Sequence, residues 1–280
     1  MNIKKIIVPF LYWPYKLKNN FLKLFFKKFN LRVLIYHDID NIECFKKQIL
    51  SLKRNWNFIT PYDFEKVING EINLSKDSLL LTFDDGFISN KYVALDFLGI
   101  QNIKAIFFII KNFAEINNET SWKNFVCTNI IPNLKNNHVQ SSCKNMNWDD
   151  LSLLIENGHT IGAHTANHLN LKKSLNISLH NEIIESALFI ENKLNIKIKH
   201  FAYPFGNLES ISNEALITAR LKFEFIHTGF RKNNLKNKNT FCIKREAIAL
   251  TDSNLYIASI LEGALDFFYQ KQIKIYEKWI

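Results

Sequence analysis

Short apolar runs alternate with segments of helical periodicity along most of the chain after residue 30. The runs are rich in valine, isoleucine, leucine and phenylalanine and end at polar or turn-forming residues, which is typical of strands. They predict strands at residues 32–37, 78–83, 103–110 and 159–164, with further strands or strand ends at 199–206, 224–229 and 241–248. The intervening periodicity predicts helices at 45–55, 90–100, 148–158 and 178–195, and a turn at 57–60 that becomes helical at Pro61.

The predicted strands lack the polar alternation of a half-exposed sheet, so both of their faces are expected to be covered. Strands that alternate with helices in this way predict an α/β fold, with a parallel sheet or barrel and outer helices. Residues 111–147 interrupt the alternation and are predicted to be a long insertion, either a loop that shapes a substrate groove or a surface excursion. The 280-residue chain therefore fits one domain at 31–254, preceded by a basic segment at 1–30 and followed by an apolar C-terminal helix at 255–280.

The charge of the chain is unevenly placed. Of a net charge of +10, eight positive charges lie within the first 32 residues, where no Asp or Glu occurs, so the rest is nearly balanced. The body contains no helix-turn-helix, RNP or zinc-finger pattern. We therefore expect no nucleic-acid partner.

The basic segment also has an apolar face. Its apolar residues recur at helical spacing, with lysines mostly on the other side: Leu17, Phe21, Leu24, Phe25 and Phe29. Such a helix either lies in an anionic membrane surface or packs on the domain with a solvated basic face. The apolar residues before it are too few to span a bilayer, contain two prolines and lack a small-residue cleavage site.

The four cysteines show no CxxC pairing and are expected to be free thiols, with a Cys127–Cys143 bridge as the alternative. Free thiols favour a reducing compartment. We therefore expect a cytoplasmic protein, or one bound peripherally at the inner face of a membrane through residues 1–30, with the periplasmic side as the alternative.

Acidic and histidine side chains collect at the ends of predicted strands. Asp84 and Asp85 follow one apolar run, where two adjacent carboxylates hold a cation or transfer a proton, or else cap the next helix. His164 and His168 follow another, four residues apart, a spacing that puts both imidazoles on one face if the chain turns helical. One carboxylate and two histidines leave open coordination positions on a metal such as zinc, as in catalytic sites.

A third element is FAYPFG at residues 201–206, in which Pro204 cannot join a β-ladder and Gly206 permits a sharp turn. It either offers a backbone N–H to a ligand or forms an ordinary loop. TFDDGF, HTANH and FAYPFG, in this order, resemble the first three motifs of the NodB-homology polysaccharide deacetylases, carbohydrate esterases with a distorted (β/α) barrel. The resemblance covers about residues 31–250.

Carried over residue by residue, the resemblance implies one divalent metal, zinc first and cobalt, nickel, iron or manganese as alternatives, bound by Asp85, His164 and His168. It implies that Asp84 is the general base and that the backbone N–H of Tyr203 stabilises the oxyanion. The predicted substrate contacts are Pro204, Phe205 and Trp148.

The sequence departs from the family pattern in two places. Ala202 stands where many members have an arginine that orients the base, and Arg245, at another strand end, is the candidate replacement. The C-terminal helix also lacks the histidine that protonates the leaving amine. His37, at the end of the first predicted strand, can supply this acid, because a barrel has no preferred first strand. This circular permutation resembles the deacetylases of poly-N-acetylglucosamine exopolysaccharides.

Together these residues predict a metal-dependent hydrolase that removes acetyl groups from N-acetylhexosamines of a glycan or a lipid-linked sugar. Two alternatives stay open. One is an esterase that removes O-acetyl groups from a polysaccharide with the same site, and the other is a catalytically silent carbohydrate-binding protein on the same scaffold.

Overall fold

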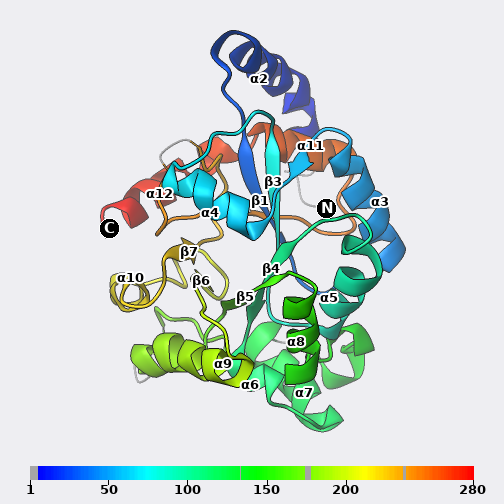
Figure 1. Cartoon of the computed structure of the whole chain (residues 1–280), viewed down its shortest axis with the longest axis vertical. Helices are drawn as coiled ribbons and strands as arrows, with labels where there is room; N and C mark the ends of the chain where they lie inside the picture. The colour runs from blue at the N-terminus through cyan, green and yellow to red at the C-terminus, as the bar shows by residue number, and fades with distance from the viewer. Residues whose placement is uncertain (1–5, 133, 174–177, 236–237) are drawn as a thin grey trace.

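The structure is a computed structural model that describes residues 6–132, 134–173, 178–235 and 238–280. Its centre is a parallel sheet in the order β7-β6-β5-β4-β3-β1-β8, with β2 beside β3 (Figure 1). The strands are β1 (Leu31–Tyr36), β2 (Asn57–Phe58), β3 (Ser78–Phe83), β4 (Ala105–Ile109), β5 (Thr160–Ala163), β6 (His200–Ala202), β7 (Phe225–His227) and β8 (Glu246–Ala247). The predicted α/β fold with parallel strands is confirmed.

The order of the strands brings the two ends of the domain together. β1 lies between β3 and β8, so the first strand of the chain pairs with the last. The Ile243 N–H donates to the Ile226 carbonyl and the Thr228 N–H donates to the Ile243 carbonyl, which links β7 to the segment that leads into β8. The sheet therefore curls into a distorted half-barrel, as expected from the resemblance, and the carboxyl ends of β1, β3 and β5 lie along one rim.

Helices begin where the sequence supplies caps and pack around the sheet (Figure 1). The side chains of Asn41, Thr60, Asn147 and Ser212 each accept a backbone N–H from the first turn of the helix that follows. These helices are α3 (Ile42–Lys53), α4 (Pro61–Asn69), α8 (Trp148–Glu156) and α10 (Asn213–Arg220). Two others adjoin π-helical turns. The helix α5 (Ile88–Val93) runs into η2 (Ala94–Leu98), and α9 (Ser186–Leu194) follows η6 (Asn181–Glu185).

Two apolar clusters fill the two sides of the sheet. One contains Leu34 and Leu81 with residues of α3, α5, α8, α9 and α10, and so lies between the sheet and these helices. The other joins Val33 and Leu80 to residues of β4, β6 and β7 and to Phe64 of α4, and so fills the concave side. Both faces of the strands are buried, which explains why their sequences show no polar alternation.

Residues 111–147 fold into short helices around an apolar cluster of their own. The helices are α6 (Lys111–Ala114), α7 (Glu119–Phe125), η3 (Val126–Ile130), η4 (Asn136–His138) and η5 (Ser141–Cys143). Trp122 is buried there with Phe113 and with Phe87 of the loop after β3. This contact fixes the segment beside the rim where β3 ends.

The C-terminal region is divided, whereas the sequence predicted one helix over residues 255–280. It forms α11 (Asn254–Glu262), η7 (Asp266–Tyr269) and α12 (Gln270–Glu277). Gly263 ends α11 with a φ of +105°, and a Cβ there would lie 3.0 Å from Nη2 of the buried Arg32. The helix ends because only glycine combines this backbone conformation with this close approach.

The N-terminal residues form η1 (Val8–Leu11) and α2 (Tyr12–Phe26). The helix ends before Phe29, which the sequence placed on its apolar face, because Lys27 adopts a left-handed conformation with φ of +50°. Among the described residues, no helix is both long and apolar enough to cross a bilayer. All four cysteines are free thiols, as predicted.

A candidate metal centre at the carboxyl ends of the strands

A pocket of about 260 Å³ lies at the rim where β1, β3 and β5 end. Among the residues that the sequence singled out, Tyr203 and Phe205 line it together with six acidic, basic or imidazole side chains: His37, Asp84, Asp85, His164, His168 and Arg245. These six come from four separate parts of the chain, and parallel pairing brings them together because each follows or precedes a strand at the same rim.

Asp85, His164 and His168 form a compact buried triad. The Nε2 atoms of His164 and His168 lie 3.5 Å and 3.4 Å from Asp85 Oδ1. The potential ligand atoms all lie within 4.8 Å of one another. The predicted set of three metal ligands is therefore brought together by the fold.

Hydrogen bonds behind the histidines fix which ring nitrogen faces the pocket. Nδ1 of His164 lies 2.7 Å from the Ala202 carbonyl oxygen, and Nδ1 of His168 lies 2.9 Å from the Asn129 carbonyl oxygen. A carbonyl oxygen only accepts hydrogen bonds, so Nδ1 carries the proton. In the neutral ring, Nε2 then has a free lone pair. Such partners are typical of metal-bound histidines, because they set the tautomer and the orientation of the ring.

The triad fits a cation. Oδ1 of Asp85 is buried and has no hydrogen-bond partner among the described residues, and the two Nε2 lone pairs are directed toward it. Buried acceptors without a donor are costly, and a divalent ion satisfies all three. Burial opposes ionisation of Asp85, but the electrostatic interactions of the carboxylate with the neighbouring imidazoles outweigh it and lower the pKa of this carboxyl.

The backbone around the triad adopts uncommon conformations. Asp85, Thr165, His168 and Phe205 have φ values of +74°, +66°, +57° and +61°, and all except Thr165 line the pocket. Non-glycine residues in this region cost free energy and persist where the surrounding fold holds them. A hydrogen bond to a side-chain hydroxyl helps here, since the His168 N–H donates to Thr165 Oγ1 at 2.9 Å.

Arg245 holds Asp84 through both carboxylate oxygens. Nη1 lies 2.7 Å from Oδ1 and Nη2 lies 3.0 Å from Oδ2, while Nε donates to the Thr228 carbonyl at 3.1 Å. Both side chains are almost fully buried. Burial would raise the pKa of Asp84, but the charges of Arg245 and His164 lower it, so the carboxyl is ionised. The structure thus places Arg245, from the segment before β8, in contact with both oxygens of Asp84.

Breaking this pair alone is expected to destabilise the fold. In an Arg245→Gln variant, Asp84 keeps a buried charge without its partner, so the free energy of unfolding should fall by about 3–5 kcal/mol. Urea unfolding followed by circular dichroism measures this change. Adding Asp84→Asn removes the unpaired charge and should recover part of the loss. A double variant as unstable as the sum of the two single variants would show that the pair does not interact.

His37 lies at the open side of the same pocket. It follows β1 directly, is exposed, and lines the pocket with Asp84 and Asp85. Its backbone carbonyl accepts a hydrogen bond from Asn90 Nδ2 at 2.7 Å. The position of β1 between β3 and β8 therefore carries an imidazole from the start of the chain to a site built mainly by later segments.

Two of the predicted residues have other partners in the structure. Tyr203 lines the pocket, but its N–H donates to the His227 carbonyl at 3.2 Å and its side chain is buried against Tyr276. Trp148 begins α8, where its ring packs on Phe189 at 5.9 Å between centroids, and it does not line the pocket.

The remaining part of the FAYPFG motif does reach the pocket. Phe205 lines it with an exposed ring that lies 4.7 Å from the His168 ring. Among the described residues, the Phe205 N–H has no hydrogen-bond partner. Pro204 is buried and is not among the lining residues.

The sequence did not reveal two further contributors. The Asn129 carbonyl that fixes His168 lies in the π-helical turn η3, and a backbone carbonyl leaves no trace in the residue type. Asp38 also lines the pocket, where it accepts hydrogen bonds from the hydroxyls of Ser89 and Ser142 at 2.7 Å and 2.8 Å. In the sequence, only its position directly after His37 in VLIYHDID indicated that Asp38 could lie at the site.

Three solved structures share this fold. The Streptococcus pyogenes deacetylase PplD, in complex with acetate, is 19% identical with a TM-score of 0.64, and the match covers 83% of this chain and 98% of that chain. IcaB from Ammonifex degensii is 20% identical with a TM-score of 0.64, covering 84% and 98%. A de-N-acetylase from Aggregatibacter actinomycetemcomitans is 17% identical with a TM-score of 0.64, covering 82% and 99%.

A search of curated proteins found no significant match. A sequence profile described as polysaccharide deacetylase, however, matches residues 71–224, more than half of the chain. The matched region supplies all three residues of the buried Asp–His–His triad, and the fold around it is the curled parallel barrel seen in the three solved structures. The chain therefore belongs to the polysaccharide deacetylase family.

Proposed function

We propose that this protein is a metal-dependent deacetylase that hydrolyses the acetamide of N-acetylhexosamine residues, of the N-acetylglucosamine type, in a glycan. The observation that carries the proposal is the placement of a carboxylate, Asp84, and an imidazole, His37, in one pocket with the buried triad. Zinc is the first choice of metal, because two imidazole nitrogens and one carboxylate oxygen suit a borderline ion. Cobalt, nickel, iron and manganese accept the same ligands.

A divalent metal held by Asp85, His164 and His168 would supply a Lewis acid that polarises the acetyl carbonyl and favours ionisation of the attacking water. Asp84 is suited to accept the proton of that water, since it is ionised and its carboxylate is fixed by Arg245. Arg245 thus acts as a positioning residue, and Asp84 as the base.

Negative charge develops on the carbonyl oxygen as water adds to the carbon. A backbone N–H directed at this oxygen stabilises the charge, and the unpaired N–H of Phe205 takes the role that the sequence assigned to Tyr203. His37 then donates a proton to the sugar nitrogen, the C–N bond breaks, and acetate and a free amine leave.

The acid in the pocket favours an amide over an ester as substrate. An amine leaves only after its nitrogen is protonated, whereas the oxygen of an ester depends less on such an acid. Two solved structures of the same fold also support an N-acetyl amide as the bond that is cleaved. One of these proteins is a de-N-acetylase, and the other was solved in complex with acetate. A silent binding protein would need neither Asp84 nor His37.

Acetate and free amine, measured together, test the proposal. The panel contains N-acetylglucosamine oligosaccharides, O-acetylated xylan oligosaccharides and a lipid-linked N-acetylglucosamine, each with chelator-treated and zinc-restored protein. We expect equal amounts of acetate and amine from the N-acetylated glycans, only after metal is restored. Acetate without amine would indicate the O-acetyl esterase, and binding of a glycan without acetate release would indicate the silent scaffold.

A further inference from the structure

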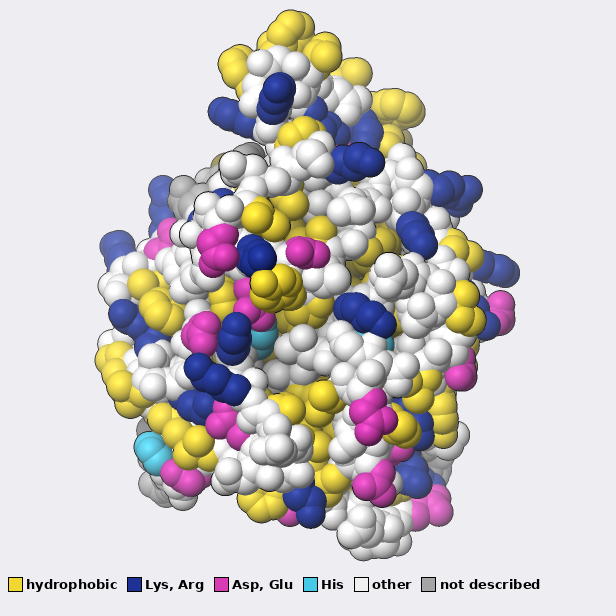
Figure 2. Space-filling model, in the orientation of Figure 1, with side chains coloured by type: hydrophobic (Ala, Val, Ile, Leu, Met, Phe, Trp, Pro, Cys, Tyr) yellow, Lys and Arg dark blue, Asp and Glu magenta, His cyan; other side chains and the backbone are white. Residues whose placement is uncertain are grey.

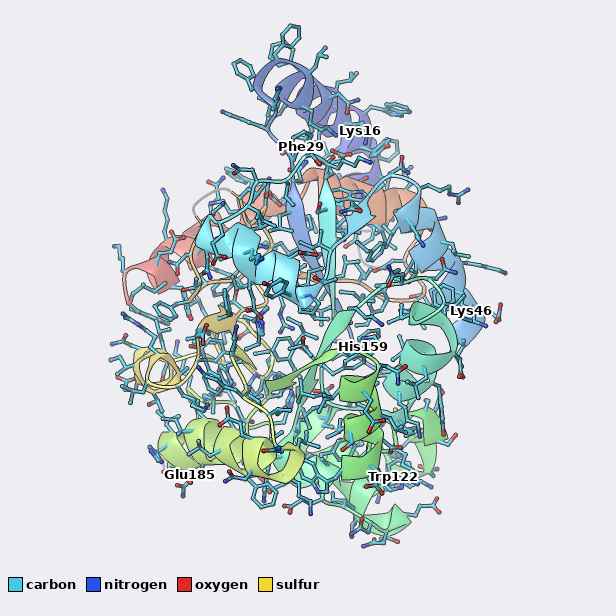
Figure 3. All side chains as sticks on the ribbon, viewed as in Figure 1. Lys16, Phe29, Lys46, Trp122, His159 and Glu185 are labelled. Carbon is cyan, nitrogen blue, oxygen red and sulfur yellow. The ribbon has the colours of Figure 1, made fainter. Side chains whose placement is uncertain are left out.

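The helix α2 packs on α11 through Tyr15, which lies against an apolar cluster with Tyr256 and Ile260, and through the polar side chains beside it. Nζ of Lys16 lies 2.7 Å from Glu262 Oε1, and Nδ2 of Asn19 donates to Glu262 Oε2 at 2.7 Å. Nζ of Lys23 lies 2.7 Å from Asp77 Oδ2. Lys16, labelled in Figure 3, therefore lies on the side of α2 that faces α11. These contacts fix the rotation of the helix about its axis.

The opposite face of α2 is an apolar stripe that points into solvent. Its side chains are spaced three or four residues apart, which puts them on one side of the helix. They are Phe10 of the preceding turn η1 and Trp13, Leu17, Phe21 and Leu24 of α2, with exposures of 78%, 67%, 65%, 54% and 77%. Figure 2 shows yellow apolar side chains over the outer end of this helix, with dark blue basic side chains beside them. We call these five residues the α2 stripe.

This arrangement is the reverse of an ordinary surface helix. An amphipathic helix of a globular domain turns its apolar face to the core and its charged face to water. Here partly buried ion pairs hold the helix the other way round, so the α2 stripe does not belong to the core of the domain. A continuous apolar surface of this kind marks a binding site.

A second apolar patch follows the end of α11. Val8, just before α2, packs with Ala264 and Leu265 at the end of α11. Phe267 and Phe268 follow directly and are 70% and 58% exposed. They share a shallow surface pocket with three lysines of the next helix: Lys271, Lys274 and Lys278.

The charges around these patches select the partner. Lys18, Lys27 and Lys28 are exposed around the α2 stripe, and no acidic residue occurs in the first 32 residues of the sequence. A second copy of the chain would bring the same positive charges against them. An anionic lipid surface instead attracts them while taking up the aromatic and aliphatic side chains.

We propose that the α2 stripe and the Phe267–Phe268 patch dock this protein peripherally on an anionic lipid bilayer. α2 leads into the amino end of β1, whereas the metal pocket lies at its carboxyl end, six residues and about 20 Å away. This geometry has a consequence for the substrate, which rests on the proposed deacetylation. A glycan that extends away from the bilayer can reach the pocket more readily than a sugar attached directly to a lipid.

Vesicle sedimentation tests the docking with phosphatidylcholine alone and with added phosphatidylglycerol. We expect binding only to the anionic vesicles. A Leu17→Ser, Phe21→Ser, Leu24→Ser variant should bind at least about 10-fold more weakly. A Lys18→Glu, Lys27→Glu, Lys28→Glu variant should lose on the order of 100-fold or more. Both sets spare Lys16, Asn19 and Lys23, which hold the helix in place.

The matched control is Ile217→Ser, Leu221→Ser, which removes apolar side chains of 52% and 75% exposure at α10, outside the proposed surface. It should bind vesicles like the parent protein. Equal binding to neutral and anionic vesicles would overturn the proposal. It would also be overturned if the protein did not bind vesicles and sedimentation velocity showed a dimer that the α2 stripe variant abolishes. Because vesicle binding is read without substrate, its result is independent of whether the pocket releases acetate.

Discussion

An Asp85→Asn variant is expected to lose zinc binding and to lower acetate release by about 10³-fold or more. The substitution keeps the size of the side chain, and asparagine tolerates the left-handed backbone of this residue, where φ is +74°. It removes the only carboxylate of the triad, leaving two imidazoles. A metal Lewis acid contributes several kcal/mol to such reactions, and each 1.4 kcal/mol corresponds to a factor of ten.

Zinc titration into chelator-treated protein, with acetate release measured in parallel, checks this result. The matched control is Glu209→Gln, which neutralises an exposed carboxylate outside the pocket and should leave both quantities unchanged. Circular dichroism verifies that each variant is folded. If Asp85→Asn bound zinc as tightly as the parent protein, the assignment of the triad as the metal centre would be wrong.

A His37→Ala variant is expected to retain zinc but to deacetylate N-acetylated glycans about 10² to 10⁴ times more slowly, the usual contribution of a positioned acid. His37 is exposed and is not one of the three triad residues, so its removal should leave the fold and the metal in place. The loss should be much smaller for an activated aryl acetate, whose leaving group needs no proton.

The comparison between the two substrates distinguishes the acid from a merely structural role. A His138→Ala variant, which removes an exposed histidine of η4 that does not line the pocket, serves as the control and should behave like the parent protein. Equal losses on the amide and on the aryl acetate, or a loss of zinc, would contradict proton donation by His37.

Much of the site follows from where polar residues stand in the sequence. Asp84 and Asp85 come directly after an apolar strand, and His164 comes directly after another. In a parallel sheet such residues meet at one rim, so their proximity could be predicted without coordinates. The proximity of His37 and Arg245 needed the additional assumption of a barrel, since it depends on β1 lying between β3 and β8.

The contacts that the sequence could not reveal lie between distant segments. Whether the Tyr203 N–H is free depends on β7, which takes it into a ladder bond with His227. Whether Trp148 faces the pocket depends on α9, whose Phe189 packs on its ring. The continuous apolar periodicity of the C-terminal region concealed the end of α11 at Gly263, which adjoins Arg32 from the other end of the chain.

The sequence by itself indicated the chemistry that we propose: the three potential metal ligands, the proposed base and acid, and the alternation of strands and helices that carries them to one rim. These features are local, because they depend on residue type and on position relative to a strand. Only the tertiary structure decided which backbone N–H groups stay unpaired and which face of α2 turns outward. The spacing of an amphipathic helix is the same whichever side packs, and the choice is made by ion pairs to Glu262 and Asp77, far away in the chain.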